Sequence, residues 1–422
     1  MRTPVVIVGG GAAGLATAIF AKRLNPSVAV TVLESARKPG AKILVSGGGR
    51  CNVTNRIVTE ADFEGGNPIV IRRVLRAFPA SETVAFFQSL GVPLHEEAGG
   101  KLFPDSNRAR DVLEALLREA DARGVRLIAG QHVLGVAKAD DAFRVTTSEG
   151  DIAAESLVLA TGGRSLPKTG SDGAGFVFAT SLGHSLVPTT PALVPLVLAE
   201  GPGDESSAAP PLHQRLSGVS HDAELTVRVD GRVLRRLRGS LLWTHFGVSG
   251  PVALDVSRHW ARARLEGRTV RVTMSVCPGR TFDDVEQRLA ALRKGQPKAS
   301  LLLVLSTLVP ASLAAGLIAR TRLDGALPLA HLARGDRRRL VHALTDWTLP
   351  VADTRGYQYA EATAGGVPLT EIAASTMASK ACRSLYLVGE MLDADGRIGG
   401  FNFQWAWSSG YVAGRALAAR HA

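Results

Sequence analysis

The chain has 422 residues, and 45% of them are hydrophobic, so we exclude a disordered chain and expect more than one domain. The three cysteines are too few for a disulfide framework and contain no CxxC pair, so we expect a cytoplasmic protein without a bound metal. The formal net charge is +11, and arginine clusters such as 71–76 and 232–238 contribute to it. Because aromatic residues do not interleave with these clusters, a solvated basic surface is favoured over nucleic-acid binding.

The first residues follow the pattern of a dinucleotide-binding fold. An apolar run at 5–8 predicts a buried parallel strand, and helix-forming residues follow at 12–24. Between them, Gly9, Gly11 and Gly14 form G-x-G-x-x-G. These glycines permit a tight turn, the approach of a pyrophosphate and close packing of helix on strand. The N-terminus of the helix would supply N–H groups and a positive dipole end to the phosphates.

A second strand is predicted at 28–34, and it ends on Glu34. This carboxylate can accept both ribose hydroxyls of an adenosine and would repel a 2′-phosphate, which leaves FAD and NAD as alternatives and argues against NADP in this site.

The loop "SGGGRCN" at 46–52 helps to decide between the two. A NAD-type domain has no evident need for a second glycine-rich loop, whereas a cofactor with a distant flavin does. Backbone N–H groups at Gly47, Gly48 and Gly49 can approach the ribityl chain or the flavin, and the segment after them can cap a helix at Asn52 or Thr54. We therefore predict FAD.

This segment resembles the flavoproteins with a glutathione-reductase-type FAD domain. In their disulfide members a second cysteine follows the first by five positions, but here Arg56 stands five positions after Cys51. We therefore predict no redox-active disulfide. Cys51 is expected to pack near the flavin as a small apolar residue.

The segments 125–150 and 156–167 are predicted to add strands to the cofactor domain. The backbone at Val133 is expected to meet the adenine, and the "ATGG" turn that contains Thr161 and Gly162 is expected to lie against the cofactor.

The middle of the chain has a different character. Alternating short apolar runs predict a β-rich domain with a hairpin at 229–231, and helical periodicity follows it. The uncharged stretch 299–319 is long enough to span a membrane, but Pro310 interrupts it, so two buried helices are favoured and no membrane span is predicted. In "WTHFGVSGP", His245 is a candidate for catalysis, but a satisfied structural histidine is the favoured interpretation.

The last forty residues repeat the pattern of the first ones, a short strand followed by a glycine turn and a helix. A short strand in "LYLVG" is followed by Gly389, Glu390 and Asp393. The carboxylates of Glu390 and Asp393 can accept hydrogen bonds from a ribityl chain. A glycine turn then leads into a helix that begins near 399–402. Its dipole can point at the N1–O2 edge of a flavin.

Together these segments resemble the bacterial aminoacetone-oxidase-like, BaiN/RdsA-type FAD-binding oxidoreductases over nearly the whole chain. The resemblance rests on "VVIVGGGAAGLA", "KILVSGGGRCNVTN", "LVLATGGRS", "LLWTHFGVSGPVALDVS", "EATAGGVPLTEI", "TMASK" and "LYLVGEMLDADGRIGGFNFQWAWSSGY". The expected fold is α/β, with a glutathione-reductase-type Rossmann FAD domain built from both chain ends, a β-rich middle domain and a helical insertion. The expected boundaries are 1–188 and 382–422 for the FAD domain, 189–280 and 346–381 for the β-rich substrate domain, and 281–345 for the insertion.

The predicted cofactor-binding residues are Gly9, Gly11, Ala13, Gly14, Glu34, Lys42, Ser46, Gly47, Gly48, Arg50, Cys51, Asn52, Val133, Thr161, Gly162, Gly389, Glu390, Asp393, Gly399, Gly400, Phe401 and Asn402.

The expected activity is hydride transfer between flavin N5 and a small organic substrate. Two versions remain open: an amine or aminoketone oxidase that uses O₂, and a reductase for which NAD(P)H is a transient partner. An RNA-binding flavoprotein with a basic surface is the third alternative.

Overall fold

The computed structural model describes residues 2–199 and 210–422 and divides the chain into two compact units. Unit 1 consists of Met1–Pro191 and Ala360–Ala422, and unit 2 consists of Ala192–Tyr359. Each unit has its own apolar core.

Unit 1 is built on a sheet whose strands lie in the order β20-β21-β22-β10-β1-β2-β7. The run from β22 to β7 is parallel, as the sequence of β1 predicts, and β1 is buried on both sides. The strands of this sheet are β1 (Arg2–Val8), β2 (Val30–Glu34), β7 (Arg126–Ala129), β8 (Val133–Ala139), β9 (Ala142–Thr147), β10 (Gly150–Leu159), β20 (Ile372–Ala373), β21 (Ala378–Ser379) and β22 (Leu385–Leu387). Smaller pairings involve β3 (Thr54–Asn55), β4 (Phe63–Gly65), β5 (Leu94–Glu97), β6 (Lys101–Pro104), β11 (Val187–Ala192), β19 (Ala362–Gly366) and β23 (Ala394–Gly396).

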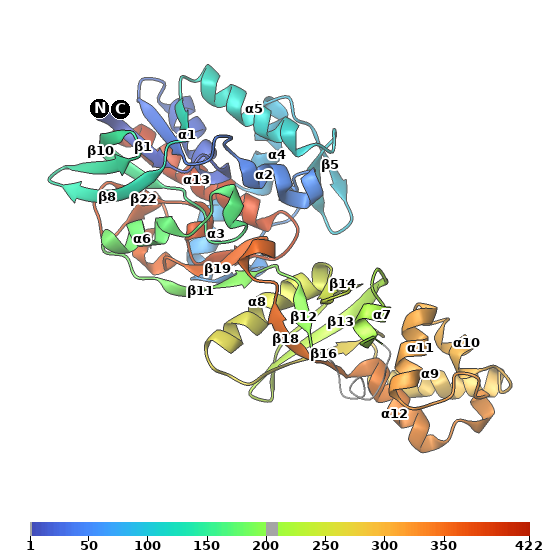
Figure 1. Cartoon of the computed structure of the whole chain (residues 1–422). Helices are drawn as coiled ribbons and strands as arrows, with labels where there is room; N and C mark the ends of the chain where they lie inside the picture. The colour runs from blue at the N-terminus through green and yellow to red at the C-terminus, as the bar shows by residue number, and fades with distance from the viewer. Residues whose placement is uncertain (1, 200–209) are drawn as a thin grey trace. The chain divides into compact units, whose positions relative to one another are not determined.

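The helices of unit 1 are α1 (Ala12–Leu24), α2 (Ala41–Val45), α3 (Pro68–Ala77), α4 (Ala80–Ser89), α5 (Ala109–Ala122), α6 (Ala174–Ser181) and α13 (Phe401–Arg420). Helices α1 and α13, from opposite ends of the chain, lie side by side (Figure 1). A Cβ atom on Gly410 would lie 2.8 Å from the Ala16 Cβ, and one on Gly414 would lie 2.8 Å from the Thr17 carbonyl oxygen. Only glycine therefore permits this close crossing.

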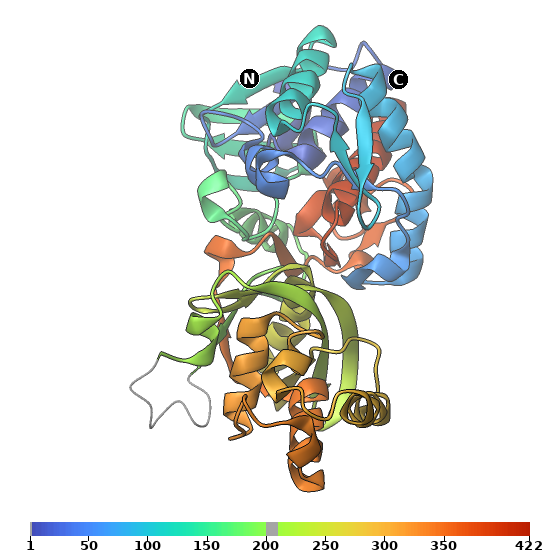
Figure 2. The same cartoon turned by 90° about the vertical axis from the view of Figure 1, so that its right-hand side faces the viewer.

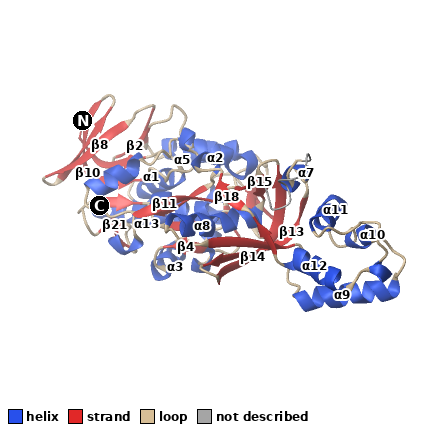
Figure 3. Ribbon diagram, turned by 60° about the horizontal axis from the view of Figure 1, so that its bottom comes forward, coloured by secondary structure: helices blue, strands red, loops and turns tan. Residues whose placement is uncertain are grey.

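Unit 2 contains an antiparallel sheet in the order β17-β16-β13-β14-β15-β12-β18. Its strands are β12 (Leu196–Leu198), β13 (Ser220–Val229), β14 (Arg232–Thr244), β15 (Gly247–Ser249), β16 (Val270–Ser275), β17 (Trp347–Leu349) and β18 (Val351–Thr354). The long β13–β14 hairpin turns at Asp230 and Gly231, as predicted (Figure 3).

The helices of unit 2 are α7 (Leu212–Arg215), α8 (Pro251–Leu265), α9 (Phe282–Gly295), α10 (Leu301–Leu305), α11 (Ala311–Arg320) and α12 (Arg334–Thr345). Helices α9 to α12 form a group beside the sheet (Figure 2). Pro310 is the N-cap of α11 and separates it from α10, as the sequence predicts. Across 2–199 and 210–422, none of the helices combines the length and apolar character that a bilayer crossing requires.

The structure corrects two domain boundaries. The sequence analysis placed all of 346–381 in the β-rich domain, but residues 360–381 belong to unit 1. The physical reason is strand pairing, because β20 and β21 extend the main sheet beyond β22. Residues 189–191 also belong to unit 1.

Candidate active site

The glycine turn between β1 and α1 leaves open space where the pattern predicts a pyrophosphate. Gly9 has a φ of +109°, and a Cβ atom there would lie 2.3 Å from the Ala160 carbonyl oxygen. A Cβ atom on Gly14 would lie 1.9 Å from the Gly9 carbonyl oxygen. By contrast, a Cβ atom on Gly11 would have no neighbour within 4 Å. Gly9 and Gly14 therefore close the turn, and Gly11 faces free space.

Helix α1 begins at this turn with free N–H groups. Its N-cap residue is Gly11, no side chain caps it, and its first turn contains no acidic residue. The amide groups and the positive end of the dipole are therefore available to an anion.

Glu34 closes the other side of the turn. Its carboxylate is buried and accepts hydrogen bonds from the N–H groups of Gly10 and Ala36, each at 2.8 Å. A carboxylate offers about four acceptor positions, so capacity remains for ribose hydroxyls beside the turn. The contact between Glu34 and ribose stays a prediction.

The triple-glycine loop adopts a backbone that favours glycine. Gly47, Gly48 and Gly49 have φ values of +55°, +69° and +84°. A Cβ atom on Gly47 would meet the Asn52 nitrogen at 3.0 Å, whereas one on Gly48 would meet nothing within 4 Å. A Cβ atom on Gly49 would meet only the Leu44 carbonyl oxygen, at 3.9 Å, so Gly48 and Gly49 are the residues of this loop with room for a ligand.

Cys51 is fully buried at the end of the loop, with a φ of +61°. Burial raises the pKa of its thiol to about 12, an effect that a hydrogen bond with Ser46 reduces only in part. A thiol with this pKa is neutral at physiological pH, so Cys51 has the character of a buried apolar residue and not of a nucleophile.

The side chains of Ser46 and Arg50 have partners within the protein. The Ser46 hydroxyl donates to the Ile43 carbonyl oxygen at 2.7 Å. The Arg50 guanidinium lies 2.6 Å from a Glu97 carboxylate oxygen and 4.1 Å from the centre of the Phe103 ring. These two side chains therefore hold the loop in place.

The predicted helix cap at Asn52 or Thr54 is wrong, because strand β3 begins there. The Asn52 amide instead accepts from the Gly400 N–H at 3.1 Å and donates to the Thr54 carbonyl oxygen at 2.8 Å. Asn55 donates to the Gly399 carbonyl oxygen at 3.1 Å. The segment that follows the triple-glycine loop is thereby joined to the glycine turn at 399–400.

Helix α13 begins at this second glycine turn. Its N-cap is Gly400, without a side-chain cap, and its first turn contains no acidic residue. Asn402 accepts from the Gly396 N–H at 2.8 Å and donates to the Gly396 carbonyl oxygen at 3.0 Å, while Phe401 is fully buried. The side chains of both residues therefore shape the turn, and the helix N-terminus stays open to an anionic or electron-rich group.

An ion pair and its hydrogen bonds connect four segments of the site. Lys42 donates to Glu390 at 2.7 Å and to the Ser165 hydroxyl at 2.9 Å. Glu390 also accepts from Ser165 at 2.7 Å and from the Thr363 N–H at 2.8 Å. Burial would raise the pKa of the Glu390 carboxyl, but the charge of Lys42 and three hydrogen bonds hold that pKa below its usual range.

The sequence analysis missed Ser165 and Thr363. Single hydroxyl residues carry no distinctive signal in a sequence, and the segment of Thr363 was placed in the other domain. Thr363 accepts from the N–H groups of Arg164 and Ser165, at 2.8 and 3.0 Å.

The other predicted residues surround the same region of unit 1. Gly389 has a φ of +73°, and a Cβ atom there would lie 2.8 Å from the Ala13 Cβ. Gly162 also has a positive φ, of +73°. The buried hydroxyl oxygen of Thr161 has no hydrogen-bond partner among the described residues. A Cβ atom on Gly175 would lie 1.8 Å from this oxygen, so the hydroxyl packs against Gly175.

Two predicted residues lie at the edges of this arrangement. Val133 begins β8 and pairs with Thr147, half-buried. Asp393 is buried, and its carbonyl oxygen accepts from the Gly66 N–H at 2.7 Å. Their contacts with adenine and ribityl chain stay predictions.

The residues of unit 1 fit an extended dinucleotide. Open space lies before Gly11 and Gly48, and the N-termini of α1 and α13 carry no side-chain cap. Gly11, Glu34 and the N-terminus of α1 would hold the nucleotide half, and Lys42, Glu390 and the N-terminus of α13 would hold the flavin half.

His245 does not join these residues, because it belongs to unit 2. Its ring is exposed and packs edge-on against Phe246, with the ring centres 5.0 Å apart. No hydrogen bond holds His245 within the described part of the chain, so the alternative of a satisfied structural histidine is not supported. Trp243 is 1% exposed and packs against Trp347, which makes it a core residue.

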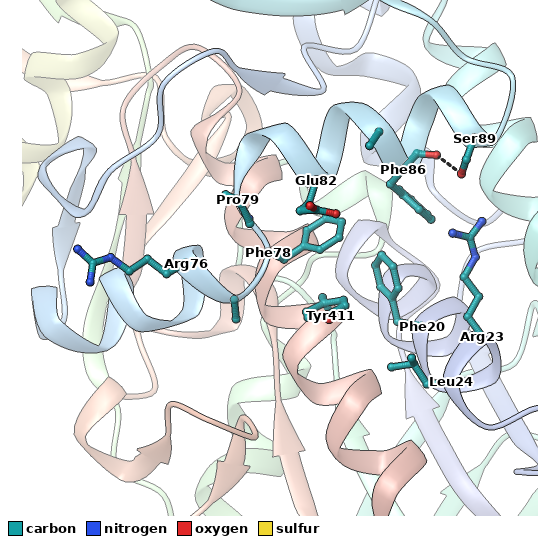
Figure 4. A pocket seen from close by; sticks show the side chains of 12 residues that line it. Phe20, Arg23, Leu24, Arg76, Phe78, Pro79, Glu82, Phe86, Ser89 and Tyr411 are labelled. Carbon is teal, nitrogen blue, oxygen red and sulfur yellow. Dashed lines mark hydrogen bonds between the residues drawn. The ribbon is translucent and has the colours of Figure 1, made fainter.

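A cavity of about 710 Å³ lies at the other end of α1 (Figure 4). The chain forms it from the C-terminal part of α1, the α3–α4 junction and α13; its lining includes Phe20, Arg23, Phe78, Phe86 and Tyr411. At a rise of about 1.5 Å per residue, Phe20 is about 13 Å along the helix from Gly11, so this cavity is separate from the glycine turns. None of the predicted site residues lines it.

Known proteins are similar to this sequence over nearly its whole length. The model of the HI0933-like protein Rossmann domain matches residues 3–416. The chain is 33% identical over 414 residues to a 3-dehydro-bile acid delta(4,6)-reductase of Clostridium scindens, covering 98% of each protein. It is also 33% identical over 421 residues to a ribosomal RNA dihydrouridine synthase of Escherichia coli, covering 99% of this chain and 98% of that protein.

The fold is also similar to that of solved flavoenzymes. A quinol fumarate reductase of E. coli superposes with a TM-score of 0.51 at 15% identity, over 100% of this chain and 70% of that one. At this identity the similarity concerns the fold alone. The family match over residues 3–416 and these relatives, together with the glycine turns of unit 1, identify the chain as a member of the HI0933-like Rossmann family and an FAD-dependent oxidoreductase.

Proposed function

We propose that this protein is a reductase that saturates a carbon–carbon double bond conjugated to a carbonyl group, with NAD(P)H as the electron donor. The observation that carries this proposal is the equal similarity to two reductive enzymes. A delta(4,6)-reductase of a 3-dehydro compound and an enzyme that makes dihydrouridine both add hydrogen to a double bond in conjugation with a carbonyl. Neither name describes the oxidation of an amine.

In this reaction NAD(P)H gives up a hydride and becomes NAD(P)⁺. The substrate gains a hydride at the carbon β to its carbonyl and a proton from solvent or protein at the α carbon, so atoms and electrons balance. FAD, when bound, supplies the hydride-transfer chemistry between the two. The chain's own contribution is to hold the cofactor through the two glycine turns and to keep Glu390 ionised beside Lys42.

The substrate that we propose is a uridine in ribosomal RNA. The net charge of +11 and the sequence pI of about 10.0 favour an anionic polymer over a small steroid. The exposed arginines of the β14 strand, such as Arg232 and Arg236, contribute to that charge.

The test is anaerobic. The FAD-loaded protein is mixed with NADH or NADPH and with ribosomal RNA from cells that lack the gene, and the digested nucleosides are measured by mass spectrometry. We expect NAD(P)H-dependent dihydrouridine. Turnover of a 3-keto-4,6-diene steroid without any reaction of RNA would restrict the proposal to small enones. Peroxide formation from an amine and O₂, without NAD(P)H oxidation, would contradict it.

A further inference from the structure

Unit 2 holds one arginine between two aromatic rings. The guanidinium carbon of Arg355 lies 3.5 Å from the centre of the Tyr359 ring and 4.4 Å from the centre of the Phe246 ring. The backbone fixes this position, because the Arg355 N–H donates to the Pro195 carbonyl oxygen at 3.0 Å. Strand β12 pairs with β15 on one side, next to Phe246, and with β18 on the other, next to Arg355.

This guanidinium has no acidic partner among the described residues. Other arginines of the chain do, since Arg337 lies 2.8 Å from Glu286 and Arg397 lies 2.8 Å from Asp62. Contact with rings occupies the faces of a guanidinium and leaves the N–H groups at its edge free. Those N–H groups have the geometry to bind two oxygens of a phosphate at once.

Two rings in this part of unit 2 are accessible to solvent. Tyr359 is 48% exposed although it is aromatic, and His245 is exposed beside Phe246. Exposed aromatic rings next to an unpaired arginine are what a single-stranded nucleotide requires, because its base stacks and its phosphate pairs with the cation.

We propose that His245, Phe246, Arg355 and Tyr359, which we call the arginine–aromatic cluster, bind a nucleotide of the RNA substrate. Arg355 binds a backbone phosphate, and Tyr359 stacks on an unpaired base. The proposal rests on the proposed RNA substrate and deepens it by naming the residues that recognise it. In the sequence, Tyr359 stands only four residues before Thr363, whose segment leads into the cofactor site.

An enzyme that modifies a base must present it outside a helical stack. A stacking ring beside a phosphate-binding arginine would hold an unpaired nucleotide next to the target uridine. This role also accounts for the finding that Arg355 has no acidic partner within 2–199 and 210–422, because an acid would compete with the phosphate.

The experiment compares four variants of the full FAD-loaded chain in binding to a single-stranded fragment of ribosomal RNA. Arg355→Gln is expected to raise Kd at least tenfold and to reduce the slope of log Kd against log salt by about 0.7, the value for one phosphate contact in single strands. Arg355→Lys keeps the charge but loses the planar fork, and we expect it to restore only part of the affinity. Tyr359→Leu is expected to raise Kd about fivefold through lost stacking.

Arg271→Gln is the matched control, because Arg271 is an exposed arginine on β16 of the same unit and has no acidic partner among the described residues. It removes the same charge, and we expect it to change Kd less than twofold. The flavin absorbance spectrum and the melting temperature show whether each variant is folded. Because the Tyr359 ring is half exposed, its replacement tests the cluster even if Arg355→Gln does not fold.

The outcomes separate the two proposals. If the wild-type protein makes dihydrouridine and folded Arg355→Gln binds RNA as tightly as wild type, the cluster proposal is wrong and the proposed function stands. If Arg355→Gln weakens the binding of NADPH but not of RNA, the phosphate that Arg355 contacts is that of the reductant, and the cluster proposal is also wrong. If the wild-type protein neither binds nor modifies RNA, both proposals fail.

Discussion

Lys42 in unit 1 and Arg355 in unit 2 are both held in place by their neighbours, but among the described residues only Lys42 has an acidic partner. Lys42 is paired with Glu390 and bonded to Ser165, so its charge is compensated inside the protein. Arg355 is fixed by rings that contribute no negative charge. The charge of Lys42 is therefore compensated before a ligand binds, whereas that of Arg355 has no acidic partner among the described residues.

This difference separates two ways to recognise a ligand. In unit 1 recognition comes mainly from the backbone, through glycine turns and open helix ends that suit one cofactor shape. In unit 2 it comes from a side-chain cation and exposed rings that tolerate many sequences of one polymer. The following changes test that contrast, in order of decreasing expected effect.

Glu34→Arg should abolish FAD binding. The N–H groups of Gly10 and Ala36 would lose their acceptor, and a cation would take the place expected for ribose. Each charged hydrogen bond contributes about 1.5–3 kcal/mol, so we expect Kd for FAD to rise at least about a hundredfold. Fluorescence quenching of added FAD measures it, and Glu34→Gln, which keeps one acceptor oxygen, should lose less. An unchanged flavin content in Glu34→Arg would show that backbone recognition does not depend on this carboxylate.

Lys42→Met should lower the free energy of unfolding by about 2 kcal/mol, because it leaves the largely buried Glu390 carboxylate without its cation. The double variant with Glu390→Gln should recover part of this loss in urea unfolding. If the two single losses simply add, the two residues do not stabilise each other.

The same ion pair predicts a pH dependence. Because the pKa of folded Glu390 is lowered, its stabilising contribution is complete above the ordinary pKa of a glutamate and is lost as pH falls through the folded value. The stability difference between wild type and Glu390→Gln should therefore shrink as the pH falls through this acid range. A difference that stays constant with pH would contradict the lowered pKa.

Gly48→Ala should cost about 1–3 kcal/mol of backbone strain and should also lower FAD occupancy or shift the flavin spectrum. Gly91→Ala is the matched control, because Gly91 has a φ of +78° and, like Gly48, no neighbour within 4 Å of an added Cβ atom. Both variants should lose similar stability, and only Gly48→Ala should affect the flavin. Equal spectra in the two variants would make the triple glycine an ordinary turn.

Cys51→Ser should have the smallest effect. A buried neutral thiol has no catalytic task, so FAD content and turnover should stay close to wild type, with a stability loss of about 1 kcal/mol for the buried hydroxyl. Turnover that disappears while FAD remains bound would show that the thiol takes part in the chemistry.

Much of unit 1 could be predicted because its signals are local. The apolar run of β1, the glycine turn and the boundaries of α1 follow from residues next to one another in the sequence. The start of α13 after Gly400 is equally local.

The remaining features depend on residues that are distant in the sequence. Segment 360–381 looks like part of a β-rich domain until β20 and β21 pair with the main sheet. Phe246 and Arg355 come together only because β12 lies between the strands that they adjoin. Their contact joins residues more than a hundred positions apart, so it could not be seen by inspecting the runs of neighbouring arginines in the sequence.

The packing of α1 against α13 also determines when the protein matures. During translation α1 leaves the ribosome well before α13, which must cover it. Unit 2 is one continuous segment and can fold in the meantime, since domains fold as units during synthesis. We therefore expect cofactor loading to follow the emergence of α13, because until then α1 lacks the helix that covers it and the site lacks its second open helix end.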